Sequence, residues 1–546
     1  MVVAVVGGGA SGCLATTQLA RSVAVTGRRF TILLVEPDDV GEGLAYRTRD
    51  PRHRLNVPAA KMSAFDDDPQ HFLRWLRRHV AVDFPSGGFA PPQFYADYLR
   101  HTLEETLRAA TGVRCEQVCA RATDVRRHGR RLRLTLDDGT SHPVDAVVLA
   151  LGHGAPTTSW APPALARSPR FVSDPWRADS QPRVPAGSDV LLVGSGLTMA
   201  DMAQRWSWAG VRLHVTSRHG LLPLPHALDP APPLAAPELP DGPVSLARAR
   251  HLVFDHIRAA GGDWRRAVDG LRPVTAELWS RLDAAARSSF VATTMRRWDQ
   301  VRHRVDPAVH AWLEQRRAEG SLVVHAARVV DARETAAGVE VSLSDGSRVL
   351  AAAVVNCTGA GAGVRTSHDP LVMNLLASGL ATPDSLDLGF ATEGSGRLVA
   401  ADGPRPAIWA IGPLRRGGVV GEHGDPRDPR PGGRARPRRR GRPARATGRP
   451  AGARPLWPAP HRQPGGGRPL CRRARPDPAG AVRSRDAGRR TDRRPRRPRE
   501  DPRPLRDRRP RGRAGLVGRL DLDLRVGLVA PGALRLARGP ARTRAR

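Results

Sequence analysis

The sequence of 546 residues predicts an α/β fold with two Rossmann-like domains, each built on a mainly parallel sheet. The second domain is expected to be inserted within the first. Three observations lead to this prediction. An apolar strand pattern, a glycine-rich turn and a helical pattern follow one another twice, from Val2 and again from Val190. A hairpin pattern followed by a buried strand also occurs twice, ending at Gly152 and at Gly359. Beyond residue 416 the composition changes to arginine, proline and glycine, which predicts a disordered tail.

The first strand pattern is a continuous apolar run, Val2 to Val6, which is typical of a parallel strand buried on both faces. The turn "GGGASG" follows it, and a helical pattern continues through Leu14. A second apolar run, "FTILLVE", ends at Glu36, 24 residues after Gly12. Strand, glycine turn, helix and acid together make up the fingerprint of a Rossmann-type dinucleotide site.

Each residue of this first turn has an expected task. Gly7 allows a tight turn, Gly9 lets the backbone approach a pyrophosphate, and Gly12 allows the helix to pack closely on the strand. Ser11 lies within the same turn, at the helix N-terminus that would face the phosphates. Glu36 is placed to accept a hydrogen bond from a ribose hydroxyl. The alternative is a glycine-rich turn with a purely structural role.

The second strand pattern ends at Val193 and leads into Gly194 and Gly196, with Asp201 in the helix that follows. The third glycine position holds Met199, so this fingerprint is a variant. The next strand pattern ends in Ser217 and Arg218, where an acid would select NAD. Because an arginine there suits a 2′-phosphate, NADPH is favoured, and NADH stays possible. The alternative is that Arg218 is a solvated surface charge.

Two dinucleotide sites in one chain suggest a pair of cofactors that face each other. The expected pair is FAD at the first site and a nicotinamide at the second, with the flavin performing the redox chemistry. The two hairpin-and-strand repeats predict that the chain leaves the first domain near residue 160 and returns near residue 325. We therefore expect FAD-binding segments at 1–165 and 321–416, an NAD(P)-binding domain at 185–320, and a tail at 417–546.

Within the second domain, residues 244–318 show apolar residues at helical spacing, with a helix start at Asp306-Pro307. Residues 219–243 are rich in proline, which predicts an irregular loop. The arginine-containing run at 302–304 is typical of a solvated helix face, and it could also bind an anionic substrate or an NADPH phosphate.

Cysteine usage and hydropathy bound the location of the protein. The five cysteines form no C-x-x-C pair and have no partners at metal-site spacing, so no metal centre and a reducing, cytoplasmic environment are expected. The N-terminus lacks the features of a signal peptide, and no apolar run is long enough to span a membrane. No membrane partner is expected, and the sequence leaves the oligomeric state open.

The net charge of +34 is unevenly distributed along the chain. Residues 417–546 contain 38 arginines and 11 acidic residues and so carry +27 of it. A tail that binds single-stranded nucleic acid would be expected to contain aromatic residues for stacking, and this tail has one tryptophan. We therefore expect a small-molecule substrate and no nucleic-acid partner.

Several longer motifs resemble the uncharacterised FAD/NAD(P)-binding proteins that are related to flavin monooxygenases. The resemblance covers residues 1 to about 416, and its motifs are "VVGGGASG", "GEGLAYRTRDPRHRLNVPAAKMSAFDDDPQHFLRWL", "VLLVGSGLTMAD", "SRHGLLPLPH", "VVNCTG" and "IWAIGPLRRG". It implies that the stretch "RLNVPAAKMSAF" lines the flavin ring. The residues expected there are Asn56, Pro58, Lys61 and Met62, and Met62 fits an ordinary core position equally well.

The resemblance also bears on the end of the chain. Relatives continue after "IGPLRRG" with a sequence like "LWESTAIPEIR" and a short helix, and Gly412 would bring that helix to the flavin pyrophosphate. If the codons for residues 419–430 are read one base forward, they can encode much of that ending. We therefore interpret the tail as the product of a frameshift at about 416–419. A basic binding tail and a fused disordered extension are the alternatives.

Taken together, the motifs predict an FAD-dependent NAD(P)H oxidoreductase of the monooxygenase type. Its substrate is not identified by the sequence, and no side chain can be named as a general acid or base. N-hydroxylation of an amine stays open, and a thiol–disulfide reductase is disfavoured because no C-x-x-C lies near the flavin motif. The second class of function is a non-catalytic nucleotide-binding protein or an inactive product of a frameshifted gene.

Overall fold

The structure is a computed structural model that describes residues 1–26, 29–177, 182–208, 210–361 and 363–417. Residues 418–546, which make up nearly all of the predicted tail and of the proposed frameshift product, lie outside the described residues. Within the described ranges, no helix is both long and apolar enough to cross a membrane.

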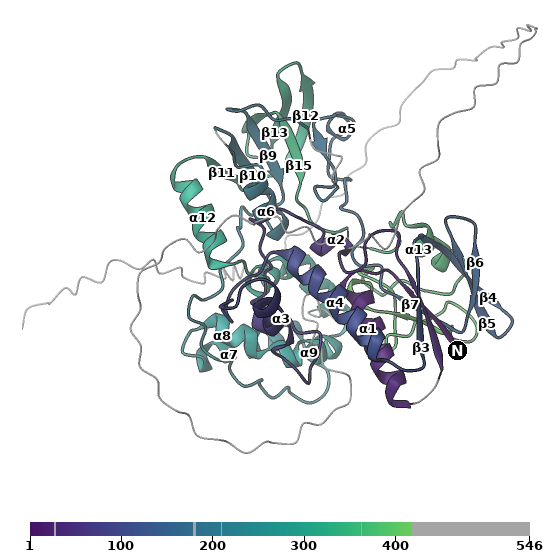
Figure 1. Cartoon of the computed structure of the whole chain (residues 1–546). Helices are drawn as coiled ribbons and strands as arrows, with labels where there is room; N and C mark the ends of the chain where they lie inside the picture. Colours follow the sequence, from purple (N-terminus) through teal and green to yellow (C-terminus); the bar gives the residue numbers. More distant parts are fainter. Residues whose placement is uncertain (27–28, 178–181, 209, 362, 418–546) are drawn as a thin grey trace, which may run out of the picture. The chain divides into compact units, whose positions relative to one another are not determined.

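The first sheet is wholly parallel and has the strand order β16-β7-β1-β2-β3. Its strands β3 and β7 are labelled in Figure 1. Side chains of one face, including Val5 and Ile32, pack with helices α1 (Ala10–Thr26) and α4 (Pro92–Ala109). Side chains of the other face pack on a three-stranded antiparallel sheet and on helix α13 (Pro370–Ala377). The strands of these two sheets are β1 (Val2–Val6), β2 (Phe30–Val35), β3 (Val113–Val118), β7 (Ala146–Leu149) and β16 (Ile408–Ala410), and β4 (Ala122–His128), β5 (Arg131–Leu136) and β6 (Ser141–Val144).

The second sheet repeats this arrangement with the order β11-β10-β9-β15-β8, and every pairing in it is parallel. One face packs on helices α6 (Leu197–Arg205) and α12 (Pro307–Ala318). The other packs on a second three-stranded antiparallel sheet. The strands are β8 (Phe171–Val172), β9 (Asp189–Val193), β10 (Arg212–Thr216), β11 (Leu322–His325) and β15 (Ala353–Asn356), and β12 (Val329–Thr335), β13 (Gly338–Leu343) and β14 (Arg348–Ala351).

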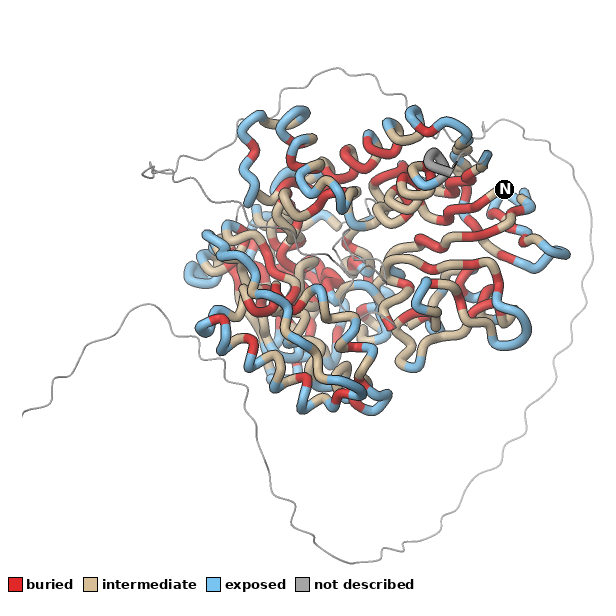
Figure 2. Tube along the Cα trace, turned by 90° about the horizontal axis from the view of Figure 1, so that it is seen from below, coloured by how far each residue is buried: buried red, intermediate tan, exposed pale blue. Residues whose placement is uncertain are grey.

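Both parallel sheets are covered on two faces, and Figure 2 shows buried stretches along strands in the interior. Burial on both faces explains why β1 and β9 are continuous apolar runs in the sequence. The predicted fold class, two Rossmann-like α/β units, is confirmed by the two parallel sheets.

The predicted return of the chain at residue 321 is wrong. Strand β15 pairs with β9, with Val354 opposite Leu191, so it belongs to the second sheet. The antiparallel strands before it pack on that sheet as well. The sequence repeat marks two complete copies of one folding unit, each with its own antiparallel sheet and last strand. The chain rejoins the first unit only at α13 and β16, after Gly363.

The segment between β10 and β11 is helical, as predicted from its spacing. Its helices are α7 (Leu246–Ala259), α8 (Trp264–Gly270), η3 (Arg272–Val274), α9 (Thr275–Arg281), α10 (Ala284–Thr293), α11 (Met295–Arg302) and α12. The predicted start of α12 is confirmed, because the Asp306 side chain accepts a hydrogen bond from the amide of Ala308 and Pro307 follows it. Residues 219–243 form an irregular loop with an isolated bridge at Pro225.

The remaining short elements frame the regions described below. They are α2 (Gly43–Tyr46), η1 (Ala59–Lys61), α3 (His71–His79), α5 (Pro163–Ala166) and η4 (Gly412–Arg415).

Candidate functional site

The first glycine turn joins β1 to α1 at the carboxyl edge of the sheet. The Gly7 amide donates to the Val35 carbonyl at 2.8 Å, and Gly7 adopts a positive φ of 101°. A β-carbon on Gly7 would lie under 3.0 Å from the Ala150 carbonyl oxygen, and one on Gly12 would lie under 3.0 Å from the Gly7 oxygen. Both positions therefore exclude any side chain, and the turn holds strand, helix and neighbouring strand together.

Glu36 lies directly against this turn. One carboxylate oxygen accepts a hydrogen bond from the Gly8 amide at 2.5 Å, and the other accepts from the Asp38 amide at 3.0 Å. Burial raises the pKa of Glu36, although both amide hydrogen bonds oppose that shift. On the other side of the turn, a β-carbon on Gly9 would lie 3.2 Å from the Cα of Gly43.

The end of the described chain also reaches this turn. Gly412 has a φ of 66°, and a β-carbon there would lie 2.7 Å from Oγ of Ser11. The Ile411 amide bonds the carbonyl of Leu149, so β16 delivers Gly412 beside the strand that ends before Gly152. The structure thus brings together six residues predicted to form the FAD-binding site, namely Gly7, Gly9, Ser11, Gly12, Gly152 and Gly412.

The second glycine turn has the same construction. The Gly194 amide donates to the Thr216 carbonyl at 2.8 Å, and a β-carbon on Gly194 would lie under 3.0 Å from the Cys357 carbonyl oxygen. Gly196 differs, because a β-carbon there would meet no atom within 4 Å. Gly359, with a φ of 85°, follows β15 at the same edge and is equally open. The space in front of this turn fits the backbone approach that a pyrophosphate requires.

Two further residues predicted to belong to the second site are Asp201 and Arg218. Asp201 sits on α6, half-buried, and burial with the charge of Asp50 raises its pKa to about 8. Its carbonyl oxygen lies 3.1 Å from Nε2 of His53, a fully buried side chain in the block after Glu36. Arg218 is exposed, immediately after Ser217 at the end of β10.

The loop at 56–62 meets the segment that follows the second turn. The Asn56 carbonyl oxygen accepts a hydrogen bond from Nε2 of His226 at 2.9 Å. Burial, together with the charge of Arg304, lowers the pKa of His226 to about 4, so this imidazole is neutral and keeps its Nδ1 as an acceptor. Met62 is buried in the core with Leu55, as the alternative interpretation allowed.

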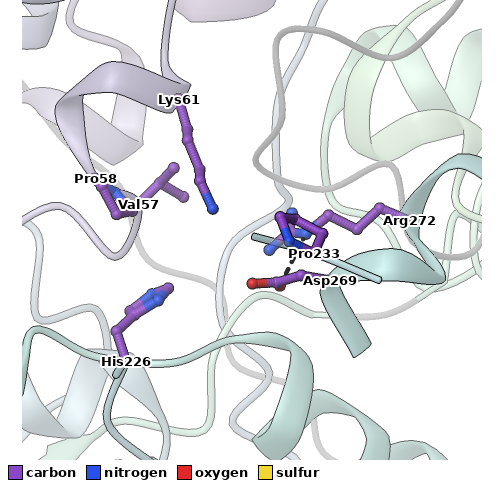
Figure 3. Close-up of a pocket in the computed structure, with 7 residues that line it drawn as sticks. All are labelled: Val57, Pro58, Lys61, His226, Pro233, Asp269 and Arg272. Atoms are coloured by element: carbon purple, nitrogen blue, oxygen red, sulfur yellow. Dashed lines mark hydrogen bonds and ion pairs between the residues drawn. The ribbon is translucent and has the colours of Figure 1, made fainter. Parts of the chain in front are cut away.

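A pocket of about 200 Å³ lies next to this loop (Figure 3). Lys61 and Asp269 point into it from opposite sides, and His226 closes a third side. It is lined by Val57, Pro58, Lys61, His226, Pro233, Asp269 and Arg272. The sequence indicated the Pro58–Lys61 part only. His226 ends the motif "SRHGLLPLPH", which gave no sign of a pocket, and Asp269 of α8 and Arg272 of η3 belong to no motif.

Positive charge predominates around this pocket. Asp269 pairs with Arg304, a side chain with 2% exposure, and with Arg272 at 3.3 Å. Burial favours protonation of Asp269, but Arg304, Arg272 and Lys61 hold its pKa below the usual value. Three cations therefore surround one carboxylate. Arg302 and Arg304 are both buried, so the predicted solvated helix face is wrong at these two positions.

The described cysteines, Cys13, Cys115, Cys119 and Cys357, are all free thiols. Burial raises the pKa of Cys13 to about 12, so this thiol beside the first turn is not poised as a nucleophile. Among the residues that the structure describes, no group of three or more His, Cys, Asp or Glu side chains could hold a metal ion.

With this geometry in place, residues 4–154 match the protein family described as FAD-NAD(P)-binding. No curated protein sequence matches the chain. Among solved structures, L-lysine 6-monooxygenase from Pseudomonas syringae shares 16% identity over 78% of this chain and 95% of its own, with a TM-score of 0.51. Ornithine hydroxylase from Pseudomonas aeruginosa shares 15% identity over 77% of this chain and 93% of its own, with a TM-score of 0.48.

The family match confirms the predicted resemblance, and the likeness to L-lysine 6-monooxygenase agrees with it in fold. Residues 4–154 match the FAD-NAD(P)-binding family, and this stretch includes the first glycine turn, Glu36 and the loop at 56–62. The fold of the chain is that of L-lysine 6-monooxygenase, over nearly the whole length of that enzyme.

Proposed function

We propose that the protein is an FAD-dependent, NADPH-using oxidoreductase of the monooxygenase type. One observation carries the proposal: two glycine turns of the same backbone construction stand at the carboxyl edges of two parallel sheets in one chain. Such edges are where open α/β sheets bind dinucleotides. The match of residues 4–154 to the FAD-NAD(P)-binding family supports FAD at the first of them.

The first turn fits FAD. The amides of the turn and of α1 would face its pyrophosphate, Ser11 and Gly412 would border it, and Glu36 would accept from ribose hydroxyls. Asn56, Pro58 and Lys61 would lie near the flavin ring. When bound, FAD accepts a hydride from a nicotinamide and passes electrons to oxygen or another acceptor.

The second turn fits the nicotinamide cofactor. Gly194 and Gly196 would let its pyrophosphate approach the start of α6, with Gly359 open beside them. Ser217 and Arg218 stand where the adenosine ribose would lie, which favours NADPH over NADH. Asp201, whose backbone bonds His53, would act by fixing α6 against the first unit.

The pocket beside Lys61 is the proposed substrate site. Its surplus of positive charge favours a small substrate with an acidic group. Lys61 would orient that group, and the neutral His226 would accept a hydrogen bond through Nδ1. The protein would work in a reducing compartment such as the cytoplasm, which suits its free thiols.

The test begins with the purified chain, whose visible spectrum should show bound flavin. Addition of NADPH without oxygen should bleach that flavin, and NADH should do so more slowly. A colourless protein, or a flavin that NADPH leaves oxidised, would contradict the proposal and favour a non-catalytic nucleotide-binding protein or an inactive gene product.

A second assay addresses the substrate. NADPH oxidation in air should rise with small carboxylates that fit about 200 Å³ and should respond less to the corresponding amides. L-lysine and L-ornithine belong in the same panel, because the neighbours in fold are named for these substrates. Stimulation by neutral compounds alone would contradict the acidic-substrate proposal and leave the cofactor proposal standing.

A further inference from the structure

Helix α11 of the helical segment reaches the second glycine turn. Nη2 of Arg296 lies 3.3 Å from the Ser195 carbonyl oxygen, 3.2 Å from Ser195 Oγ and 3.3 Å from the Leu221 carbonyl oxygen. Ser195 is the residue between Gly194 and Gly196. A guanidinium from a distant part of the sequence is therefore fixed directly on the dinucleotide turn, and no motif in the sequence signals it.

The same place holds two hydroxyls. Ser195 Oγ lies 2.8 Å from Ser217 Oγ and 2.7 Å from the Leu221 carbonyl oxygen. Ser217 Oγ also accepts from the Gly220 amide at 3.1 Å. Since Ser217 directly follows β10 next to the turn, this hydroxyl pair stands where the adenosine ribose of a bound dinucleotide belongs.

Two cations flank the hydroxyl pair. Arg218 directly follows Ser217, and Arg296 approaches from α11. Burial lowers the pKa of Arg296, Asp299 opposes this shift, and the charge of Arg218 adds to it. The guanidinium of Arg296 therefore interacts electrostatically with both Asp299 on its own helix and Arg218 across the turn. A phosphate monoester near Ser217 would be matched by two arginines that otherwise repel each other.

We propose that Arg296 is a second determinant of cofactor specificity, and that with Arg218 it holds the 2′-phosphate of NADPH. This inference rests on the proposed function, because it assumes a nicotinamide dinucleotide at the second turn. It assigns to the helical segment a part in cofactor choice.

Calorimetry on the full chain tests the proposal with two fragments, adenosine 2′,5′-bisphosphate and 5′-AMP, which lacks the 2′-phosphate. The unsubstituted protein should bind the bisphosphate more tightly. Arg296→Gln should weaken the bisphosphate about tenfold or more and leave 5′-AMP unchanged, because a charge-assisted hydrogen bond to phosphate is lost. Arg296→Lys should restore part of the preference for the bisphosphate over 5′-AMP.

The matched control is Arg297→Gln, which removes an exposed arginine one residue along α11. It should leave both fragments unaffected. Equal weakening of both fragments by Arg296→Gln would show that Arg296 only supports the turn, and would overturn the proposal. An unchanged preference for the bisphosphate would overturn it too. If the unsubstituted protein binds neither fragment, the proposed function fails along with it.

The preference for NADPH over NADH in anaerobic flavin reduction gives an independent reading. Arg296→Gln should lower the ratio of the two kcat/KM values about tenfold or more, and Arg297→Gln should not change it. A loss of rate that is equal with both nicotinamides would again assign Arg296 a structural role only.

Discussion

The two glycine turns share a backbone and differ in the side chains around it. Gly7 and Gly194 make the same amide hydrogen bond, to Val35 and to Thr216, at the same distance of 2.8 Å. Each also packs against the carbonyl of the residue that directly follows a neighbouring strand, Ala150 after β7 and Cys357 after β15. The shared part is what a dinucleotide pyrophosphate requires of any such turn.

The difference lies where the second residue of each turn meets the end of the next strand. In the first turn the Gly8 amide donates to the carboxylate of Glu36. In the second the Ser195 hydroxyl meets the Ser217 hydroxyl, with Arg296 beside them. An anion suits a ribose with free hydroxyls and repels a 2′-phosphate, whereas hydroxyls with arginines suit the phosphate. One position therefore accounts for the different cofactors proposed for the two turns.

The largest expected effect comes from the third glycine of the first turn. A β-carbon at Gly12 would overlap the Gly7 carbonyl oxygen, whereas the second turn accommodates a fully buried Met199 at the equivalent position. Gly12→Ala should destabilise the chain by about 3 kcal/mol, because helix and strand must separate. It should also abolish flavin retention.

Urea unfolding and the flavin-to-protein absorbance ratio check this. Gly394→Ala is the control, since Gly394 is exposed and its β-carbon would be unobstructed. A Gly12→Ala protein with the stability and flavin content of the control would show that close packing at the first turn is dispensable.

The next effect separates binding from stability at the second turn. Gly196 has a φ of −92°, which alanine tolerates, and a β-carbon there meets nothing within 4 Å. Gly196→Ala should therefore leave unfolding unchanged within about 0.5 kcal/mol. It should weaken NADPH about tenfold or more, because the methyl group occupies the path of the pyrophosphate.

Fluorescence titration with NADPH, run beside urea unfolding, measures both quantities. A variant that binds NADPH normally would mean that the open space before Gly196 is not the pyrophosphate site. Unchanged flavin content is expected throughout, since the first turn is untouched.

Glu36→Gln sharpens the comparison at the position where the turns differ. Glutamine has one acceptor oxygen, and its NH₂ group only donates, so it cannot accept from both the Gly8 and the Asp38 amides. The negative charge of Glu36 is lost as well. FAD should bind about tenfold more weakly, as judged by reconstitution of the apoprotein. Asp38→Asn, which changes a carboxylate exposed nearby, is the control. Equal FAD affinity in both variants would remove Glu36 from the ribose site.

The comparison also shows what the sequence could reveal. Turn glycines and strand ends are local in the chain, so the first turn, the second turn and the fold class could be predicted from spacing. The return of the chain could not, because β7 and β15 end in similar sequences and only pairing with β1 or β9 distinguishes them.

Contacts made across the fold were the harder part of the site. Arg296 and His226 lie far in sequence from the turn and the loop that they meet. Arg304 looked like a solvated charge and is instead buried on Asp269. Arginines in a helical pattern look alike in sequence, whether the folded chain turns them toward solvent or toward an ion pair.

The last comparison concerns Asp201, whose equivalent on α1 is Leu14. The pKa of Asp201 is raised to about 8, so the folded protein keeps a proton that the unfolded chain releases near pH 4. The unfolded state therefore binds fewer protons, and stability declines as the pH rises from about 4 to 8.

Asp201→Asn removes this decline in stability with rising pH. It should be more stable than the unsubstituted protein by up to about 5 kcal/mol at pH 9 and equal to it near pH 4, as measured by urea unfolding. Asp229→Asn, at an exposed position, should give no such gain. If Asp201→Asn leaves the pH dependence of the unfolding free energy unchanged, Asp201 is charged in the folded protein. The position on α6 would then contribute no pH dependence, like the apolar Leu14 at the equivalent position of α1.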